Sequence, residues 1–278
     1  MLSSGWSKRF EEVEMKVLLM TDLEGVAGVV SFEHQADPSG RYYEEARGLL
    51  TAEVNAAVEG LQEAGMAEVL VVDGHGAGGI TFAELHPAAG LLHGRPFPPW
   101  SLLAPIFAEY DVAVMIGQHA RAGVATENLS HTQNERTVEY YRLNGREIGE
   151  IGQFALYCGG LGRPLIFLSG SEAACREAEE LLPGITTVAV KRGVSRGSAI
   201  ALSAPEARQR IREGIRRAVE RQRENPLPPL SWEGPYVLEI RYHFTEVADA
   251  RVAQPGVERV DGRTVRLRGD HILDLIYR

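Results

Sequence analysis

The chain has 278 residues, of which 44% are hydrophobic and 24% are charged, an ordinary composition for a globular protein of one large or two unequal domains. Lys plus Arg number 29 and Asp plus Glu number 38, so the formal net charge is −9. Nucleic-acid binding favours a basic face, so this balance argues against a nucleic-acid partner. It equally gives no support for binding to an anionic membrane.

The sequence shows no targeting or membrane-spanning pattern. No apolar run approaches the ~20 residues of a membrane helix, and residues 1–14 lack the apolar core of a secretory signal. Cys158 and Cys175 have neither metal-binding nor redox spacing, which is typical of a reducing compartment. We therefore expect a cytoplasmic protein in which residues 1–14 are a disordered extension or precede the true start.

Strand-like and helix-like segments alternate through the first 200 residues. Short apolar runs, typical of strands buried on both faces, alternate with stretches of helical periodicity. The strands are expected at 16–22, 68–73, 111–117, 137–143, 164–168 and 186–190, and the helices at 42–64, 101–110, 147–158 and 169–183. This alternation predicts an α/β fold with a mainly parallel sheet flanked by helices.

The pattern changes after about residue 200. An arginine-rich helix is expected at 204–224, followed by a strand at 236–242 and a hairpin that turns at Asp261-Gly262. We therefore expect a metal-binding catalytic α/β domain over 15–200 and a smaller C-terminal α+β region over 201–278.

Metal-ligand residue types follow three of the expected strands. Asp22 and Glu24 follow the first, Asp73 and His75 the second, and His119 the third. Because ligands bind beyond the carboxyl ends of parallel strands, these side chains should converge on one crevice. Each alone could be a helix cap or a packed loop residue, but the repetition favours a metal site. Mixed carboxylate and imidazole ligands suit Zn²⁺, with Mn²⁺ or Co²⁺ as alternatives.

The segment 74–79 also contains a GxGxxG match directly after a strand. A dinucleotide site would need an uninterrupted helix and an acidic residue beyond it, but Pro87 interrupts the helix and 90–100 has no acid. We therefore interpret the glycines as a tight turn beside His75.

Six motifs together resemble the M55 peptidases, a family of bacterial D-aminopeptidases. They occur in the family's order over about residues 15–203: TDLEGVAGV, VVDGHG, ELHP, IGQHARAG, LSHT and NGREIGEIG. The resemblance implies a site with two divalent metal ions, in which Asp22 bridges both. It implies that His75 and His119 complete one ion's ligands, that Glu24 and Glu150 complete the other's, and that His131 is the catalytic histidine.

The activity implied by the resemblance is hydrolysis of the N-terminal peptide bond of short peptides, with D-amino acids at the amino end. His131 would transfer a proton to the leaving amine or stabilise the oxyanion. Asp73 would either orient a ligand histidine or anchor its loop. The resemblance also implies a homo-oligomer, a decamer. Two alternatives stay open: another two-metal hydrolase, such as an amidase or phosphoesterase, and a non-catalytic metal- or peptide-binding module.

Overall fold

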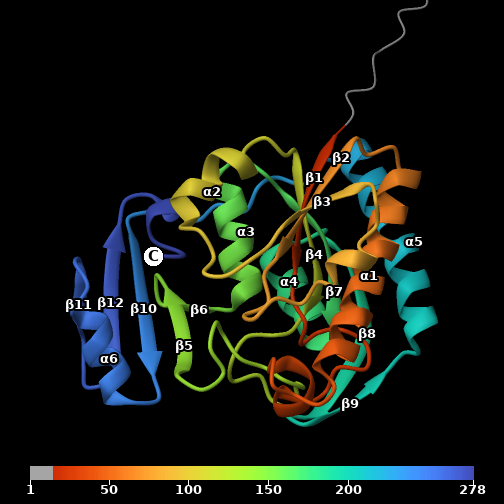
Figure 1. Ribbon diagram of the computed structural model, residues 1–278. Coiled ribbons are helices and arrows are strands. Elements are labelled where there is room, and N and C mark those ends of the chain that lie inside the picture. The colour runs from red at the N-terminus through yellow and green to blue at the C-terminus, as the bar shows by residue number, and fades with distance from the viewer. Residues whose placement is uncertain (1–14) are drawn as a thin grey trace, which may run out of the picture.

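In the computed structural model, which describes residues 15–278, the body of the protein is a seven-stranded sheet (Figure 1). The expected extension at 1–14 lies outside the described residues. Neighbouring strands pair in parallel except for β8 and β9, which pair antiparallel. The strand order is β3 (Ala89–Leu92), β2 (Glu68–Asp73), β1 (Lys16–Thr21), β4 (Val112–Gln118), β7 (Leu165–Ser171), β8 (Thr186–Ser195) and β9 (Ser198–Ala201).

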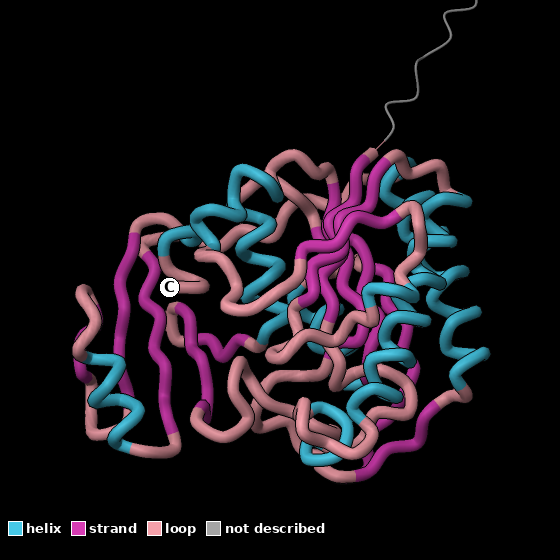
Figure 2. The backbone as a smooth tube through the Cα atoms, in the orientation of Figure 1, coloured by secondary structure: helices cyan, strands magenta, loops and turns pink. Residues whose placement is uncertain are grey.

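Helices cover both faces of this sheet (Figure 2). Alternation along β1 explains why: Val17 and Leu19 join one apolar cluster, whereas Leu18 and Met20 join the other. The first cluster packs under α1 (Tyr43–Glu63) and α5 (Ala204–Glu224), and the second under α2 (Trp100–Phe107), α3 (Glu150–Gly160) and α4 (Glu172–Leu181). This arrangement confirms the predicted α/β class.

A five-stranded antiparallel sheet, formed within the same described range, lies beside the body on the side of α2 and α3 (Figure 1). Its apolar residues join the cluster under α3. In order, its strands are β11 (Val257–Arg259), β12 (Thr264–Gly269), β10 (Tyr236–Tyr242), β5 (Val138–Leu143) and β6 (Arg146–Ile148), with α6 (Thr245–Val252) against it. Short helical turns occur at Phe32–Ala36, Phe82–Glu84 and Ile272–Asp274. Within the described range, no helix is both long and apolar enough to cross a bilayer.

The packing crosses the boundary expected at residue 200. Helix α5 packs on α1 in the body, whereas β5 and β6, from the middle of the chain, join the antiparallel sheet. The apolar face of α5 marks a buried side but does not say which element covers it.

The helix expected from residue 147 begins at Glu150, so its predicted start is wrong. Residues 146–148 instead pair with β5 across the Asn144-Gly145 turn. Glu147 is the cross-strand partner of Arg142, and its Oε1 lies 3.0 Å from Arg142 Nη2. Strand β3 was not predicted; it has only four residues and follows Pro87 closely.

A buried carboxylate on α1 holds the loop that follows β1. Glu53 Oε1 accepts a hydrogen bond from Ala27 N at 3.0 Å, and the side chain is 3% exposed. Burial raises the pKa of Glu53 to about 7, although the Ala27 hydrogen bond and the charge of Lys191 act to lower it. Because the folded-state pKa exceeds the unfolded value, the stability this raised pKa contributes is fully present below about pH 4.5 and is lost as pH rises through 7.

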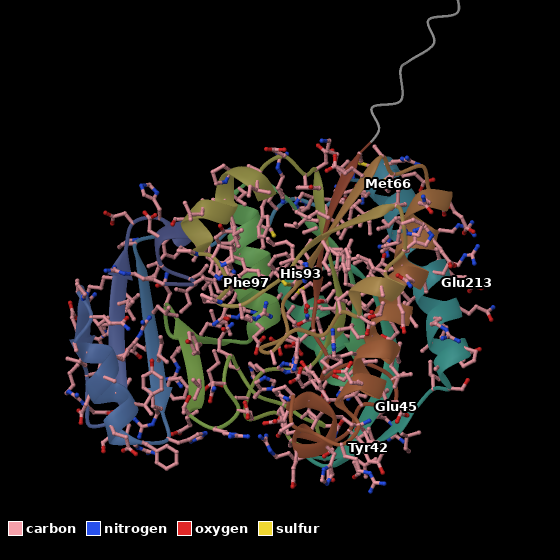
Figure 3. All side chains as sticks on the ribbon, viewed as in Figure 1. Tyr42, Glu45, Met66, His93, Phe97 and Glu213 are labelled. Carbon is pink, nitrogen blue, oxygen red and sulfur yellow. The ribbon has the colours of Figure 1, made fainter. Side chains whose placement is uncertain are left out.

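We predict that the free energy of unfolding of wild type falls between pH 5 and pH 8 by roughly 2–3 kcal/mol more than that of Glu53→Gln, because the variant has no carboxyl group to ionise at this position. Urea unfolding of both proteins in the presence of a chelator measures this difference. Glu45→Gln, at an exposed position of the same helix (Figure 3), is the control and should behave as wild type. Parallel pH profiles for wild type and Glu53→Gln would contradict the assignment.

Candidate metal centre

The predicted ligands meet at the carboxyl edge of three adjacent strands. Asp22 and Glu24 follow β1, His75 follows β2, and His119 follows β4, with β1 between the other two. Glu150, the first residue of α3, approaches the same point. All of these side chains except the partly exposed Glu150 are buried.

Backbone contact between two loops brings these ligands together. Asp22 N donates to Ile116 O at 2.9 Å, and Gly25 N donates to Gly117 O at 2.8 Å. A Cβ atom at Gly25 would lie 2.0 Å from Gln118 O, and one at Gly117, whose φ is +79°, would lie 2.0 Å from the carbonyl oxygen of Asp22. Glycine is therefore required at both positions for the loops to approach this closely.

The spacing of the donor atoms matches metal coordination. His75 Nδ1 lies 3.1 Å from Glu24 Oε2 and 3.5 Å from Asp22 Oδ1. His119 Nε2 lies 3.2 Å from Asp22 Oδ2 and 3.6 Å from Glu150 Oε1. Two ligands held tetrahedrally at zinc bond lengths lie about 3.3 Å apart. The residues present therefore fit divalent cations.

Unpaired polar atoms support the same conclusion. Asp22 Oδ2 and His119 Nε2 are buried, and neither has a hydrogen-bond partner among residues 15–278, although they lie 3.2 Å apart. Leaving such atoms unpaired is costly, and a shared cation removes the cost. The opposite ring nitrogens are already held: His75 Nε2 by Ala36 O and His119 Nδ1 by Ala120 O, both at 2.9 Å. These bonds turn the remaining nitrogens toward the carboxylates.

The protonation of the metal-free site is governed by the pairing of imidazole with carboxylate. Burial opposes charge on Asp22, but contacts with His119 and His75 hold its pKa well below its usual range. Burial likewise opposes charge on His119, yet Asp22 and Glu150 raise its pKa to about 10. The pKa of His75 is also well above its ordinary value, because Glu24 and Asp22 outweigh burial. A metal ion therefore displaces protons when it binds, and its affinity falls as pH falls.

His131 lies at the edge of this cluster. Its ring stacks on His119 with centroids 4.0 Å apart, and its Nδ1 lies 2.9 Å from Leu129 O. With Nδ1 donating to that carbonyl, Nε2 faces Glu150 Oε1 at 3.7 Å. This nitrogen is placed either to exchange a proton or to join His119 and Glu150 as a metal ligand.

The loop carrying His131 has an unusual backbone. Thr126, Leu129 and Gln133 have φ of 59°, 60° and 64°, a region that non-glycine residues rarely adopt. Gln133 N donates to Glu150 Oε1 at 2.7 Å, which ties the loop to the first turn of α3. Strained backbone held in this way is typical of functional loops.

Asp73 contacts its own loop. Its carboxylate accepts hydrogen bonds from Gly79 N at 2.7 Å and Ile80 N at 3.3 Å. These contacts support the loop-anchoring role considered for Asp73.

Two cationic side chains that the sequence patterns did not single out, the buried Lys191 and the exposed Arg95, hold the ligand loops. Arg95 donates to the carbonyl oxygens of Asp73, His75 and Gly76, and so fixes the loop that carries His75. Lys191 Nζ donates to Glu24 O, to Val29 O at 2.6 Å and to Asn128 Oδ1 at 2.8 Å. Burial lowers the pKa of Lys191 to about 8, against nearby carboxylates that raise it. A lone lysine or arginine carries no pattern that would have marked either role.

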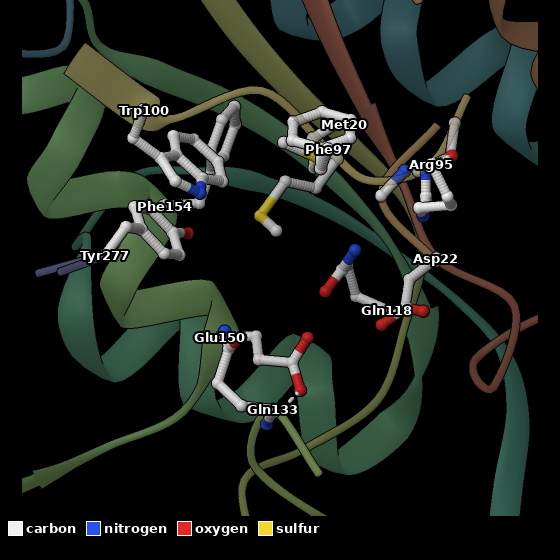
Figure 4. A pocket seen from close by; sticks show the side chains of 13 residues that line it. Met20, Asp22, Arg95, Phe97, Trp100, Gln118, Gln133, Glu150, Phe154 and Tyr277 are labelled. Atoms are coloured by element: carbon white, nitrogen blue, oxygen red, sulfur yellow. Dashed lines mark hydrogen bonds between the residues drawn. The ribbon is translucent and has the colours of Figure 1, made fainter. Parts of the chain in front are cut away.

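The cluster lies between two hollows that share Asp22, Gly74, Gln133 and Glu150. One is rich in aromatic and sulfur-containing side chains (Figure 4). The other is polar and is lined by charged residues together with the histidines: Glu24, Asp37, His75, His131, Glu135 and Arg136. A substrate that spans the metal centre would therefore meet different chemistry on its two sides.

Comparison with known proteins agrees with this geometry. The sequence profile of the M55 peptidases, described as D-aminopeptidase, matches residues 15–277. A curated D-aminopeptidase of Bacillus subtilis (strain 168) is 31% identical over 251 residues, which cover 90% of this chain and 89% of the relative. The solved structure of the Zn-dependent D-aminopeptidase DppA from Bacillus subtilis, described as a self-compartmentalizing protease, superposes with a TM-score of 0.87 at 30% identity, covering 94% of each chain. The chain therefore belongs to the M55 family of D-aminopeptidases and is a metal-dependent aminopeptidase.

Proposed function

We propose that this protein holds two zinc ions and removes the N-terminal residue from short peptides that begin with a D-amino acid. The observation that carries the proposal is the position of the Asp22 carboxylate, which presents one oxygen to His75 and the other to His119. The zinc dependence and the D-preference are proposed because the Bacillus subtilis relatives are D-aminopeptidases, one of them Zn-dependent.

The separations group the ligands around Asp22 in overlapping sets. Glu24 and His75 lie together on the Oδ1 side of Asp22, and His119 and Glu150 lie together on the Oδ2 side. Asp22, Glu24 and His119 also lie close enough together to share an ion. Asp22 would therefore be common to both ions, and the assignment of His75 and His119 to one ion and of Glu24 and Glu150 to the other stays a proposal.

Divalent cations held there would supply an activated water and polarise the scissile carbonyl. His131 would carry the proton to the leaving amine. Its Nδ1 is held by Leu129 O, so its Nε2 is the nitrogen that takes up a proton and then donates it to that amine. The Glu150 carboxylate lies 3.7 Å from this nitrogen. Asp73 and Arg95 would keep the His75 loop in place without touching substrate.

Rival hydrolases use similar ligands. Carboxylate and histidine clusters also serve amidases and phosphoesterases. The stacked His131 at the edge of the cluster argues against a module that only binds metal or peptide, since it adds a proton-transfer group to the ligand set.

A substrate panel tests the proposed function. We expect hydrolysis of D-aminoacyl anilides and D-dipeptides at rates well above those of their L-isomers, with little turnover of aryl phosphates or N-acetylated peptides. A chelator should abolish the activity, and returned Zn²⁺, Mn²⁺ or Co²⁺ should restore it. Preferred cleavage of aryl phosphates, or activity untouched by chelation, would refute the proposal.

His131 and His75 should respond differently to alanine substitution. We predict that His131→Ala retains two metal ions per chain but lowers kcat by roughly 10²–10⁴-fold, the usual scale for general acid–base catalysis. His75→Ala should lose metal as well as activity. Elemental analysis beside single-substrate kinetics separates the two. Loss of metal in His131→Ala would make this residue a ligand, and turnover within a few-fold of wild type would give it a packing role only.

We further propose that the subunits form a closed homo-oligomer, a decamer, inside a cytoplasmic setting. The support is the description of the superposed relative as self-compartmentalizing. Antiparallel edges such as β9 and β11 are surfaces by which subunits commonly join. Light scattering at micromolar concentration should give the mass of ten chains; a monomer mass would end the proposal.

A further inference from the structure

An apolar pocket opens directly beside the metal centre. Figure 4 shows aromatic rings on one side of it and the Asp22 and Glu150 carboxylates on the other. Its volume is about 190 Å³, and a cavity of about 150 Å³ elsewhere accommodates benzene. The pocket therefore has room for an aliphatic or aromatic side chain. Its apolar lining consists of Met20, Phe97, Trp100, Met115, Phe154 and Tyr277.

The aromatic wall is held in a fixed shape. The Trp100 ring stacks on Tyr277 with centroids 3.6 Å apart and planes 8° from parallel. Tyr157 meets Trp100 edge-on at 4.9 Å and donates its hydroxyl to the Trp100 carbonyl at 2.6 Å. A wall fixed from two sides discriminates between side chains by shape.

The pocket is also in register with the metal ligands. Phe154 lies four residues after Glu150 on α3, so both side chains project from the same helix face. Met20 precedes Asp22 by two residues at the end of β1, and it pairs with Met115 of β4 across the sheet. A substrate side chain in the pocket therefore lies at a fixed distance from a scissile bond held at the metal centre.

Gln118 supplies a polar group at the junction of pocket and metal centre. Its amide points into the space between Met20 and Glu150 (Figure 4). The side chain is 2% exposed, and its Oε1 has no hydrogen-bond partner in the part of the chain that the structure describes. A buried acceptor left unpaired in this position is suited to a donor on the ligand.

The position of His131 decides which part of a peptide enters the pocket. His131 lines the polar hollow on the side of Asp37 and Arg136, and it is not among the residues that line the apolar pocket. The leaving amine must lie within reach of the group that protonates it. The leaving part of the substrate therefore extends into the polar hollow, and the N-terminal residue lies on the apolar side.

We propose that the apolar pocket binds the side chain of the substrate's N-terminal residue and that Gln118 accepts a hydrogen bond from the amino group of that residue. This assignment rests on the proposed function. It defines the substrate class as peptides with an apolar N-terminal residue, with selection at the first residue and tolerance at the second.

Opposite changes at Phe97 test the assignment. Kinetics on two series of D-dipeptides, one varying the first residue before alanine and one varying the second after alanine, give kcat/KM for each position. Phe97→Ala should raise the ratio of kcat/KM for tryptophan over leucine at the first position by about tenfold or more, which is the usual scale for a change of pocket size. Phe97→Trp should lower the same ratio. Ratios in the second series should stay within about threefold.

The control is Phe82→Ala, which removes a phenyl ring that is 67% exposed and should leave both series as in wild type. Gln118→Met should reduce the ratio of kcat/KM for a peptide with a free amino group on its first residue to that for the same peptide without this group. Changes confined to the second series would place the leaving residue in the pocket, and unchanged ratios with metal retained would remove the pocket from substrate binding; either result overturns the proposal.

Binding separates this proposal from the proposed function. With Trp6 and Trp232 replaced by phenylalanine, Trp100 is the remaining tryptophan of the chain's three and reports on the pocket. If no peptide is hydrolysed, the proposed function fails, but saturable quenching of Trp100 by D-leucine amide still supports the pocket. A flat titration overturns the pocket assignment whatever the activity.

Discussion

The arrangement of the site depends on one buried carboxylate that is shared between two histidines from different strands. Asp22 follows β1, and β1 is the strand that pairs with both β2 and β4. A group on that strand can therefore face His75 on one side and His119 on the other. Burying such a charge costs several kcal/mol unless cations or imidazolium groups compensate it. The sheet order thus decides where the metal centre can form.

The loops that present the ligands are fixed by cationic side chains as well as by secondary structure. Lys191 reaches from β8 to the carbonyl oxygens of the Asp22 loop and to Asn128 in the loop of His131. Several acceptors on one ammonium offset the cost of burying it. The same ammonium group therefore sets the distance between the loop of Asp22 and the loop of His131. Arg95 does the same for the His75 loop, with carbonyl oxygens as its acceptors.

The parts of the site that could be predicted from sequence are those governed by local rules. Asp22, His75 and His119 follow apolar strands, and parallel strands share one carboxyl edge, so their meeting was predictable. Glu150 and His131 lie on a helix and a loop, and only the family resemblance indicated them. Lys191 lies 167 residues from the carbonyl of Glu24 that it binds, and no periodicity encodes a contact at that separation. The start of α3 was misjudged because the Asn144-Gly145 hairpin extends to residue 148.

The C-terminal segment adds one wall to the apolar pocket but no candidate metal ligand. The candidate metal ligands all come from the parallel sheet and the helix α3 that packs on it, whereas Tyr277, next to the last residue, closes the pocket by stacking on Trp100. Under the proposed assignment, the C-terminal segment therefore takes part in substrate choice but not in metal binding. A change at Tyr277 alters the shape that faces the first residue without touching Asp22 or His119. Selection for a new N-terminal residue can then act on the C-terminal segment while the ligand geometry stays constant.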